Sequence, residues 1–102
     1  MTEDLIKWIN VGYSLRGLIM VREFDEKVED YLLHYEPLKT CRYQRLVRDV
    51  DTKKIFLVIK ASEASRGRRT SHLILDDRID DELVQTVCLH TLVGLNRRVE
   101  LF

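Results

Sequence analysis

The chain has no excess of charge of either sign. Its 102 residues include 17 basic and 17 acidic side chains, so the formal net charge is zero with neutral histidines. Divided after residue 51, the first half holds eight basic and ten acidic residues and the second half nine and seven. This asymmetry is too small to drive binding to nucleic acid or to a membrane through bulk charge.

Long apolar runs are also missing. No stretch reaches the roughly 18 apolar residues of a membrane-spanning helix, and the start of the chain is acidic where a signal peptide would be basic. We therefore expect a cytoplasmic protein with no membrane association. Cysteine is scarce as well: Cys41 and Cys88 are the only two, and both are predicted to be reduced, buried side chains.

Signatures of catalysis, of cofactor binding and of metal binding are absent from the sequence. It holds no Gly-rich phosphate loop and no nucleophile elbow. None of His34, His72 and His90 has another histidine or a cysteine at the i, i+4 spacing that places two metal ligands on one helical face, so none forms a metal-binding pattern. We therefore predict a protein that is not an enzyme, with no catalytic residue, no metal site and no cofactor.

What the sequence does contain is a likeness between its two halves. Residues 24–33 align with residues 75–84, where three of the ten pairs are identical and six exchange one acid, base or apolar residue for another. Self-similarity at a fixed spacing predicts a duplicated structural unit. Because units of about 50 residues are too short to bury a sufficient core separately, we expect the two to share one core.

The repeated unit is predicted to be strand, strand, helix, strand. In the second half the strands are expected at 54–60, 71–75 and 95–102, and the helix is expected to begin at Asp76 or Asp77, where acidic residues suit a helix N-terminus.

The first half follows the same plan. Strands are expected at 18–24 and 41–50, with a helix that begins at Asp25, buries Val28, Leu32 and Tyr35 and is stopped by Pro37. A hairpin turn at 50–53 should lead into the second half. Residues 2–11 read locally as a capped helix, but the repeat assigns them to a strand, and we favour the strand.

The predicted fold class is therefore α+β. A single domain, residues 1–102, contains a first repeat unit, 1–51, and a second, 52–102, related by a pseudo-two-fold axis, with about six strands and two helices around one core.

Two kinds of residue are candidates for binding. Tyr31 replaces Glu82 in the otherwise matched helix, so its face is expected to meet a partner or the other half of the chain. Tyr13 is the aromatic residue of the first loop and is a second candidate partner-binding residue. The one concentration of like charge consists of Arg66, Arg68 and Arg69. The paired N–H donors of an arginine guanidinium group suit phosphate oxygens.

These features favour a small, non-enzymatic protein–protein interaction module. Two similar units leave a groove between them, and short sheets leave edges that accept an extended peptide. The alternative is a small nucleic-acid-binding protein that uses Arg66, Arg68 and Arg69.

In length, composition and internal duplication the chain resembles a 102-residue protein of the filamentous viruses that infect the hyperthermophilic archaeon Acidianus. The scarcity of amides, with two Asn and two Gln, and the charged fraction of 33% agree with life in a hot cytoplasm. The resemblance implies a viral protein in the host cytoplasm and transfers no functional residue.

Overall fold

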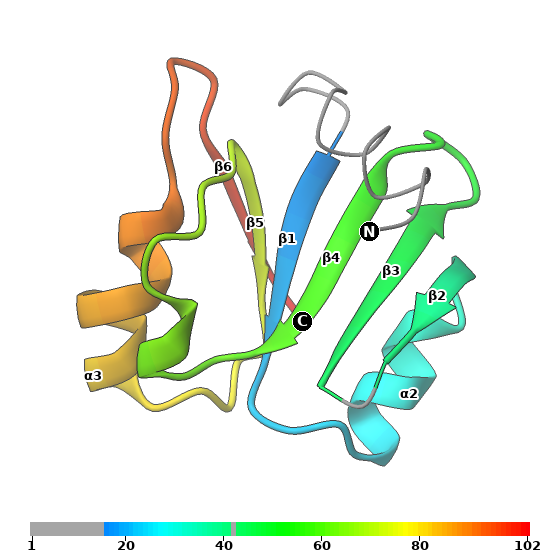
Figure 1. Cartoon of the computed structure of the whole chain (residues 1–102), viewed down its shortest axis with the longest axis horizontal. Helices are drawn as coiled ribbons and strands as arrows, with labels where there is room; N and C mark the ends of the chain where they lie inside the picture. The colour runs from blue at the N-terminus through cyan, green and yellow to red at the C-terminus, as the bar shows by residue number, and fades with distance from the viewer. Residues whose placement is uncertain (1–15, 42) are drawn as a thin grey trace.

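The computed structural model describes residues 16–41 and 43–102, which form a six-stranded mixed sheet with helical segments on both faces (Figure 1). Its elements are, in chain order, β1 (Arg16–Val21), α2 (Glu26–Leu32), β2 (Tyr35–Thr40), β3 (Gln44–Asp49), β4 (Ile55–Lys60), η2 (Glu63–Ser65), β5 (His72–Leu75), α3 (Asp81–Leu83), η3 (Val84–Cys88), η4 (Leu89–Thr91) and β6 (Arg98–Leu101).

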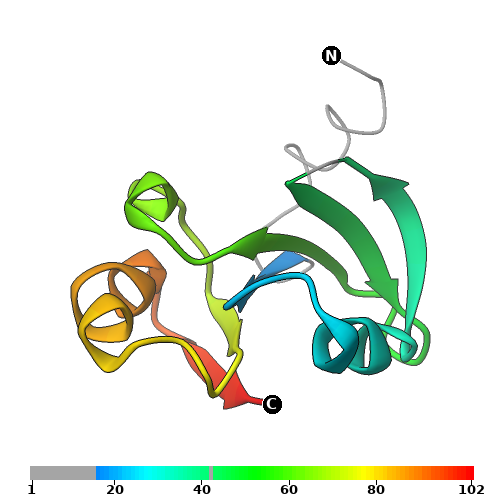
Figure 2. The ribbon, with the colours of Figure 1, turned by 90° about the horizontal axis from the view of Figure 1, so that it is seen from below.

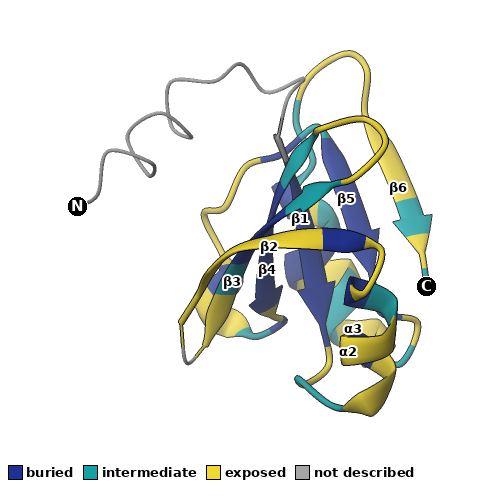
Figure 3. Ribbon diagram, turned by 90° about the vertical axis from the view of Figure 1, so that its right-hand side faces the viewer, coloured by how far each residue is buried: buried dark blue, intermediate teal, exposed yellow. Residues whose placement is uncertain are grey.

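The two halves of the chain interleave in the sheet, whose strand order is β2-β3-β4-β1-β5-β6. Strands β4, β1, β5 and β6 run parallel to one another, and β2 and β3 continue the sheet as an antiparallel hairpin. The three central strands are almost wholly apolar because both of their faces are covered, and burial falls towards the two edges (Figure 3).

Helical segments cover both faces of the sheet (Figure 2), and each face has its own hydrophobic core. Under α2, the helix residues Val28 and Leu32 pack on side chains that include Ile19, Val58 and Ile74. On the opposite face, the segment from α3 to η4 covers the remaining alternate side chains of the same strands, among them Leu18, Met20, Leu57, Leu73 and Leu75, and contributes Cys88. Both cores draw on both halves of the chain.

The hairpin turn between β3 and β4 is where the sequence predicted it. The Asp49 carboxylate accepts hydrogen bonds from the backbone N–H groups of Asp51 and Thr52, at 2.9 and 3.0 Å. Lys53 then adopts a left-handed conformation, with φ of 64°, and the chain reverses into β4.

Only one of the two predicted helix starts is right. Asp25 caps α2 and accepts a hydrogen bond from the Val28 N–H, as expected. The second helix begins at Asp81, capped by Asp80, rather than at Asp76 or Asp77. Asp76 is buried at the end of β5, where it accepts hydrogen bonds from the Arg22 N–H and from Arg78, so it serves tertiary structure and not a helix cap.

The α+β class is confirmed, whereas the internal duplication is not. In the first half α2 is followed by the antiparallel hairpin β2–β3, and in the second half the helical segment is followed by the single parallel strand β6. Pro37 does not stop the helix: α2 ends at Leu32, and both Pro37 and Tyr35 belong to β2. A proline fits there because an edge strand leaves alternate N–H groups unpaired.

Two further expectations concern single residues and the start of the chain. Cys88 is buried as predicted, but Cys41 is exposed in the short connection between β2 and β3, so that prediction was wrong. The choice between strand and helix for residues 2–11 lies outside the described residues. Of the helices that the structure describes, none is long and apolar enough to cross a membrane.

Candidate functional site

A cleft of about 480 Å³ opens on the α2 face of the sheet, next to β6. Its walls come from both halves of the chain. The lining residues are Tyr31, Tyr35, Asp49, Thr52, Lys54, Phe56, His72, Ile74, Arg98, Glu100 and Leu101.

A hydrogen-bonded chain of three ionisable side chains crosses this cleft. The Lys54 Nζ lies 2.7 Å from Nδ1 of His72, and Nε2 of His72 lies 2.5 Å from a carboxylate oxygen of Glu100. Arg98 donates to the second Glu100 oxygen at 2.9 Å. Strand register produces this arrangement, because His72 at the start of β5 is opposite Arg98 on β6, and Glu100 follows two residues later on the same face.

The hydrogen bonds of His72 determine which of its two ring nitrogens carries a proton. An ammonium group can only donate, so Nδ1 of a neutral His72 accepts from Lys54 and Nε2 carries the hydrogen that is donated to Glu100. Burial lowers the pKa of His72 and so favours this neutral form, and the hydrogen bond from His72 lowers the pKa of Glu100. Burial and then the charge of Arg98 lower the pKa of Lys54.

Aromatic rings form the floor and one wall of the cleft. Phe56 meets His72 and Tyr35 edge to face, with ring centroids 5.2 and 5.6 Å apart. Tyr31 on α2 stacks on Phe102, with centroids 4.0 Å apart, and its hydroxyl lies 2.8 Å from the Tyr35 hydroxyl. Tyr31 therefore meets the other half of the chain, one of its two predicted roles, and also lines the cleft. Tyr13 lies outside the described residues.

Strand β6 borders the cleft with an unprotected edge (Figure 1). The N–H groups of Arg98 and Phe102 bond to Ser71 and Leu75 on the β5 side, so by alternation those of Val99 and Leu101 face outward. Among the described strands, none pairs with this outer edge. Val99 and Leu101 are also exposed apolar side chains, 44% and 68% accessible.

The opposite edge of the same sheet is protected. Strand β2 carries Pro37 and an exposed Lys39, and its register with β3 shifts between these two residues. A proline, a lysine and a bulge are the devices by which natural sheets avoid pairing with other chains. The sheet therefore offers one blocked edge and one open edge.

Two of the three loop arginines, Arg66 and Arg69, donate side-chain hydrogen bonds within the protein. Arg66 binds the Glu63 carboxylate, with 2.6 Å between Nε and oxygen, and donates to the Thr86 carbonyl. Arg69 donates to the carbonyl of Arg68, and Arg68 lines a separate hollow of about 300 Å³ beside η2. Much of the donor capacity of Arg66 is therefore used inside the protein.

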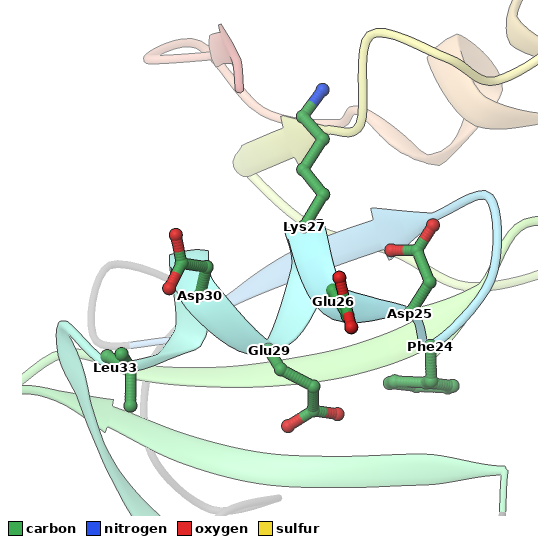
Figure 4. Close-up of a pocket in the computed structure, with 7 residues that line it drawn as sticks. All are labelled: Phe24, Asp25, Glu26, Lys27, Glu29, Asp30 and Leu33. Carbon is green, nitrogen blue, oxygen red and sulfur yellow. The ribbon is translucent and has the colours of Figure 1, made fainter.

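A second surface hollow surrounds the start of α2 and is mostly acidic. Figure 4 shows Asp25, Glu26, Glu29 and Asp30 spread around the helix, with Lys27 directed away from Glu29. Lys27 binds Asp77, and Glu29 binds Arg45, so these charges serve to hold α2 to its neighbours. Within the described part of the chain, no group of three or more metal-ligating side chains is placed to hold a metal ion.

The sequence reasoning missed Lys54, His72, Arg98 and Glu100. They are scattered over 47 positions, from 54 to 100, and become neighbours only through the strand order β4-β1-β5-β6. One signal was available: Arg98 and Glu100 alternate with apolar residues in the last strand, which indicates one polar face. Comparison with known protein families, with characterised proteins and with solved structures gives no match for this chain.

Proposed function

We propose that the protein is a non-enzymatic interaction module that binds an extended segment of a partner protein along β6, beside the cleft between its two halves. The observation that carries this proposal is the contrast between the edges, since β2 is protected and β6 exposes backbone groups and apolar side chains together. Strand addition draws affinity from such backbone groups and specificity from alternate side chains.

The charges of β6 define the chemistry of the partner segment. Arg98 and Glu100 face the α2 side of the sheet, and Val99 lies between them on the other side. An antiparallel partner strand centred on Val99 places one residue opposite Glu100 and, two positions later, another opposite Arg98. A segment that reads basic, apolar, acidic therefore pairs opposite charges at both positions, which stabilises a strand pair by about 0.2–1 kcal/mol for each pair.

The test uses two synthetic peptides of the same composition. One has the central order lysine, valine, glutamate; in the control the lysine and the glutamate are exchanged, so that like charges meet in the same register. We expect calorimetry to detect binding of the first peptide and a clearly weaker signal for the second. Equal affinity for both would contradict the proposed register.

A pair of protein variants tests the backbone contribution. Val99→Pro removes an outward N–H without touching the bonds to β5, whereas Val99→Thr keeps that N–H. The proline variant should lose peptide binding and the threonine variant should retain it. If sedimentation instead shows a wild-type dimer that Val99→Pro dissociates, then a second copy of this chain occupies the edge and the proposed peptide partner is wrong.

A further inference from the structure

We propose that Lys54 is a nucleophilic amine that forms an imine with a small 2-oxo acid held in the cleft, with Arg98 binding the carboxylate of that acid. This activity is independent of strand addition, because it depends on the interior of the cleft and not on the outer backbone of β6.

The position of Lys54 is the first argument. The side chain is partly buried and its amine lies against His72, which in turn binds Glu100. A protonated lysine cannot attack a carbonyl carbon, so a nucleophilic lysine needs a group that accepts its proton. Nδ1 of His72, at 2.7 Å, is in the position of that acceptor. The Glu100 carboxylate then faces the imidazolium that forms, at 2.5 Å from Nε2.

The remaining charged groups of the cleft support the same reading. Burial and then the charge of Arg98 lower the pKa of Lys54 and so increase the fraction of neutral amine, and they outweigh the opposing charge of Glu100. Asp49 from β3 and Glu100 are the acidic groups that line the cleft, and Tyr31 and Tyr35 add hydroxyls with pKa values raised by burial. The Arg98 side chain is 67% exposed, so part of its guanidinium group can bind a ligand carboxylate.

The volume of the cleft limits the size of the ligand. A space of about 480 Å³ holds a small molecule, and the rings of Phe56 and Tyr31 line it. A 2-oxo acid offers the carbonyl carbon next to its carboxylate, which matches an amine and a guanidinium in one small cleft.

The reaction is balanced without an oxidant or reductant. The Lys54 lone pair adds to the carbonyl carbon, and the carbonyl π electrons move to the oxygen, which takes a proton. The resulting carbinolamine loses its hydroxyl group as water while the nitrogen lone pair forms the C=N bond and the second N–H proton departs. His72 receives and returns these protons, and the sum is amine plus carbonyl giving imine plus water.

The experiment traps the imine with cyanoborohydride, using glyoxylate as the probe, and locates the label by peptide mass mapping. Lys53 is the matched internal control, since it is adjacent in sequence and exposed in the turn before β4. The neutral fraction of an amine rises about tenfold for each unit by which its pKa falls. We therefore expect faster labelling of Lys54 than of Lys53 at neutral pH, with a difference that shrinks as the pH rises.

Two variants separate the roles of the neighbours. Arg98→Gln should slow the labelling of Lys54 by glyoxylate but not by formaldehyde, which has no carboxylate. His72→Gln should move the pH profile of Lys54 labelling towards that of Lys53. Equal labelling of Lys53 and Lys54 in the wild-type protein across neutral and alkaline pH overturns the proposal, as does an unchanged glyoxylate-to-formaldehyde ratio in Arg98→Gln. The wild-type comparison decides the question even if a variant does not fold.

Discussion

Arg78 links the start of α2 to the end of β5. Its guanidinium binds the carboxylates of Asp25, at 2.5 Å, and of Asp76, at 2.9 Å. The hydrogen bond from Arg78 holds the pKa of Asp25 at about 2. Burial alone would raise the pKa of Asp76, but the hydrogen bonds from Arg78 and from the Arg22 N–H outweigh it and the pKa is lowered.

These lowered pKa values predict a defined loss of stability in acid. A carboxyl group with a lowered folded pKa stabilises the native state above its unfolded pKa, and this contribution disappears as the pH falls through the folded pKa. For Asp25 the window runs from 3.8 down to about 2. We expect Arg78→Gln to lower the free energy of unfolding at neutral pH and to reduce its further fall across this window, measured by urea denaturation.

The matched control for this experiment is Arg22→Gln. Among the residues that the structure describes, the Arg22 side chain binds only the exposed neighbour Glu23. The backbone N–H of Arg22, which donates to Asp76, is kept in this variant. Exposed ion pairs contribute little, so this variant should follow the wild-type pH curve. A pH dependence in Arg78→Gln identical to that of the wild type would show that Arg78 does not set the acid stability.

Gly17 determines the position of the Phe56 ring under the cleft. A Cβ atom added at Gly17 would lie 2.4 Å from Cε2 of Phe56 and 3.0 Å from the carbonyl oxygen of His72. Overpacking a buried site in this way costs about 1–3 kcal/mol. We expect Gly17→Ala to lower the free energy of unfolding by this amount in chemical denaturation.

A second substitution identifies the cause of that cost. If the ring is responsible, Gly17→Ala combined with Phe56→Leu should be less destabilised than the sum of the two single variants. Strict additivity of the two effects would place the strain elsewhere, in the backbone of β1.

At the scale of elements, an aromatic stack helps to hold α2 to Phe102. Tyr31 stacks on Phe102 across the cleft wall, while Val28 and Leu32 bury the inner face of the helix. Tyr31→Ala should cost about 1–3 kcal/mol of stability through lost burial and lost ring contact. Hydrogen exchange should detect the loosening as reduced protection of the amides in α2.

Tyr31→Phe is the control that separates the ring from the hydroxyl. It keeps the stack and loses only the contact with the Tyr35 hydroxyl, so the cost should stay at about 0.5–1.5 kcal/mol. Equal effects of the two substitutions would mean that the hydroxyl pair, and not the stacked rings, anchors α2.

At the scale of the whole molecule, the interleaved sheet predicts that neither half folds alone. Strand β4 of the second half lies between β3 and β1 of the first, so the fragment 52–102 deprives β4 of both neighbours and the fragment 1–51 leaves β1 without β4 and β5. We expect circular dichroism to show no cooperative thermal transition for either fragment. Such a transition in one of them would contradict the shared core.

Local patterns predicted some of these features and not others. The apolar runs that became β1, β4 and β5 were identified because strands covered on both faces need such composition. The Asp25 cap was predictable because the backbone N–H group that Asp25 caps lies within four residues of it in the sequence. Asp76 has the same local context, but its partner Arg22 is 54 positions away in the sequence. No residue near Asp76 therefore indicates that its carboxylate accepts a hydrogen bond from another part of the fold.

The candidate site was hidden for the same reason. Taken singly, none of the three residues stands out in the sequence. Lys54 is a lysine beside a strand, His72 is a lone histidine and Glu100 is a surface acid. Their contact depends on the order β4-β1-β5-β6, which the sequence did not specify. Neither the cytoplasmic location nor the viral origin is addressed by the fold, and both stay predictions of the sequence.

The difference between the two sheet edges also decides how far assembly can proceed. A molecule with two open edges adds copies at both ends and grows into a fibre. Here Pro37, Lys39 and the bulge between them block growth at β2, so any strand that docks on β6 ends the sheet unless it brings an open edge of its own. Association through β6 therefore stops at a finite complex. A protein rich in β-structure can thus keep one open sheet edge without polymerising.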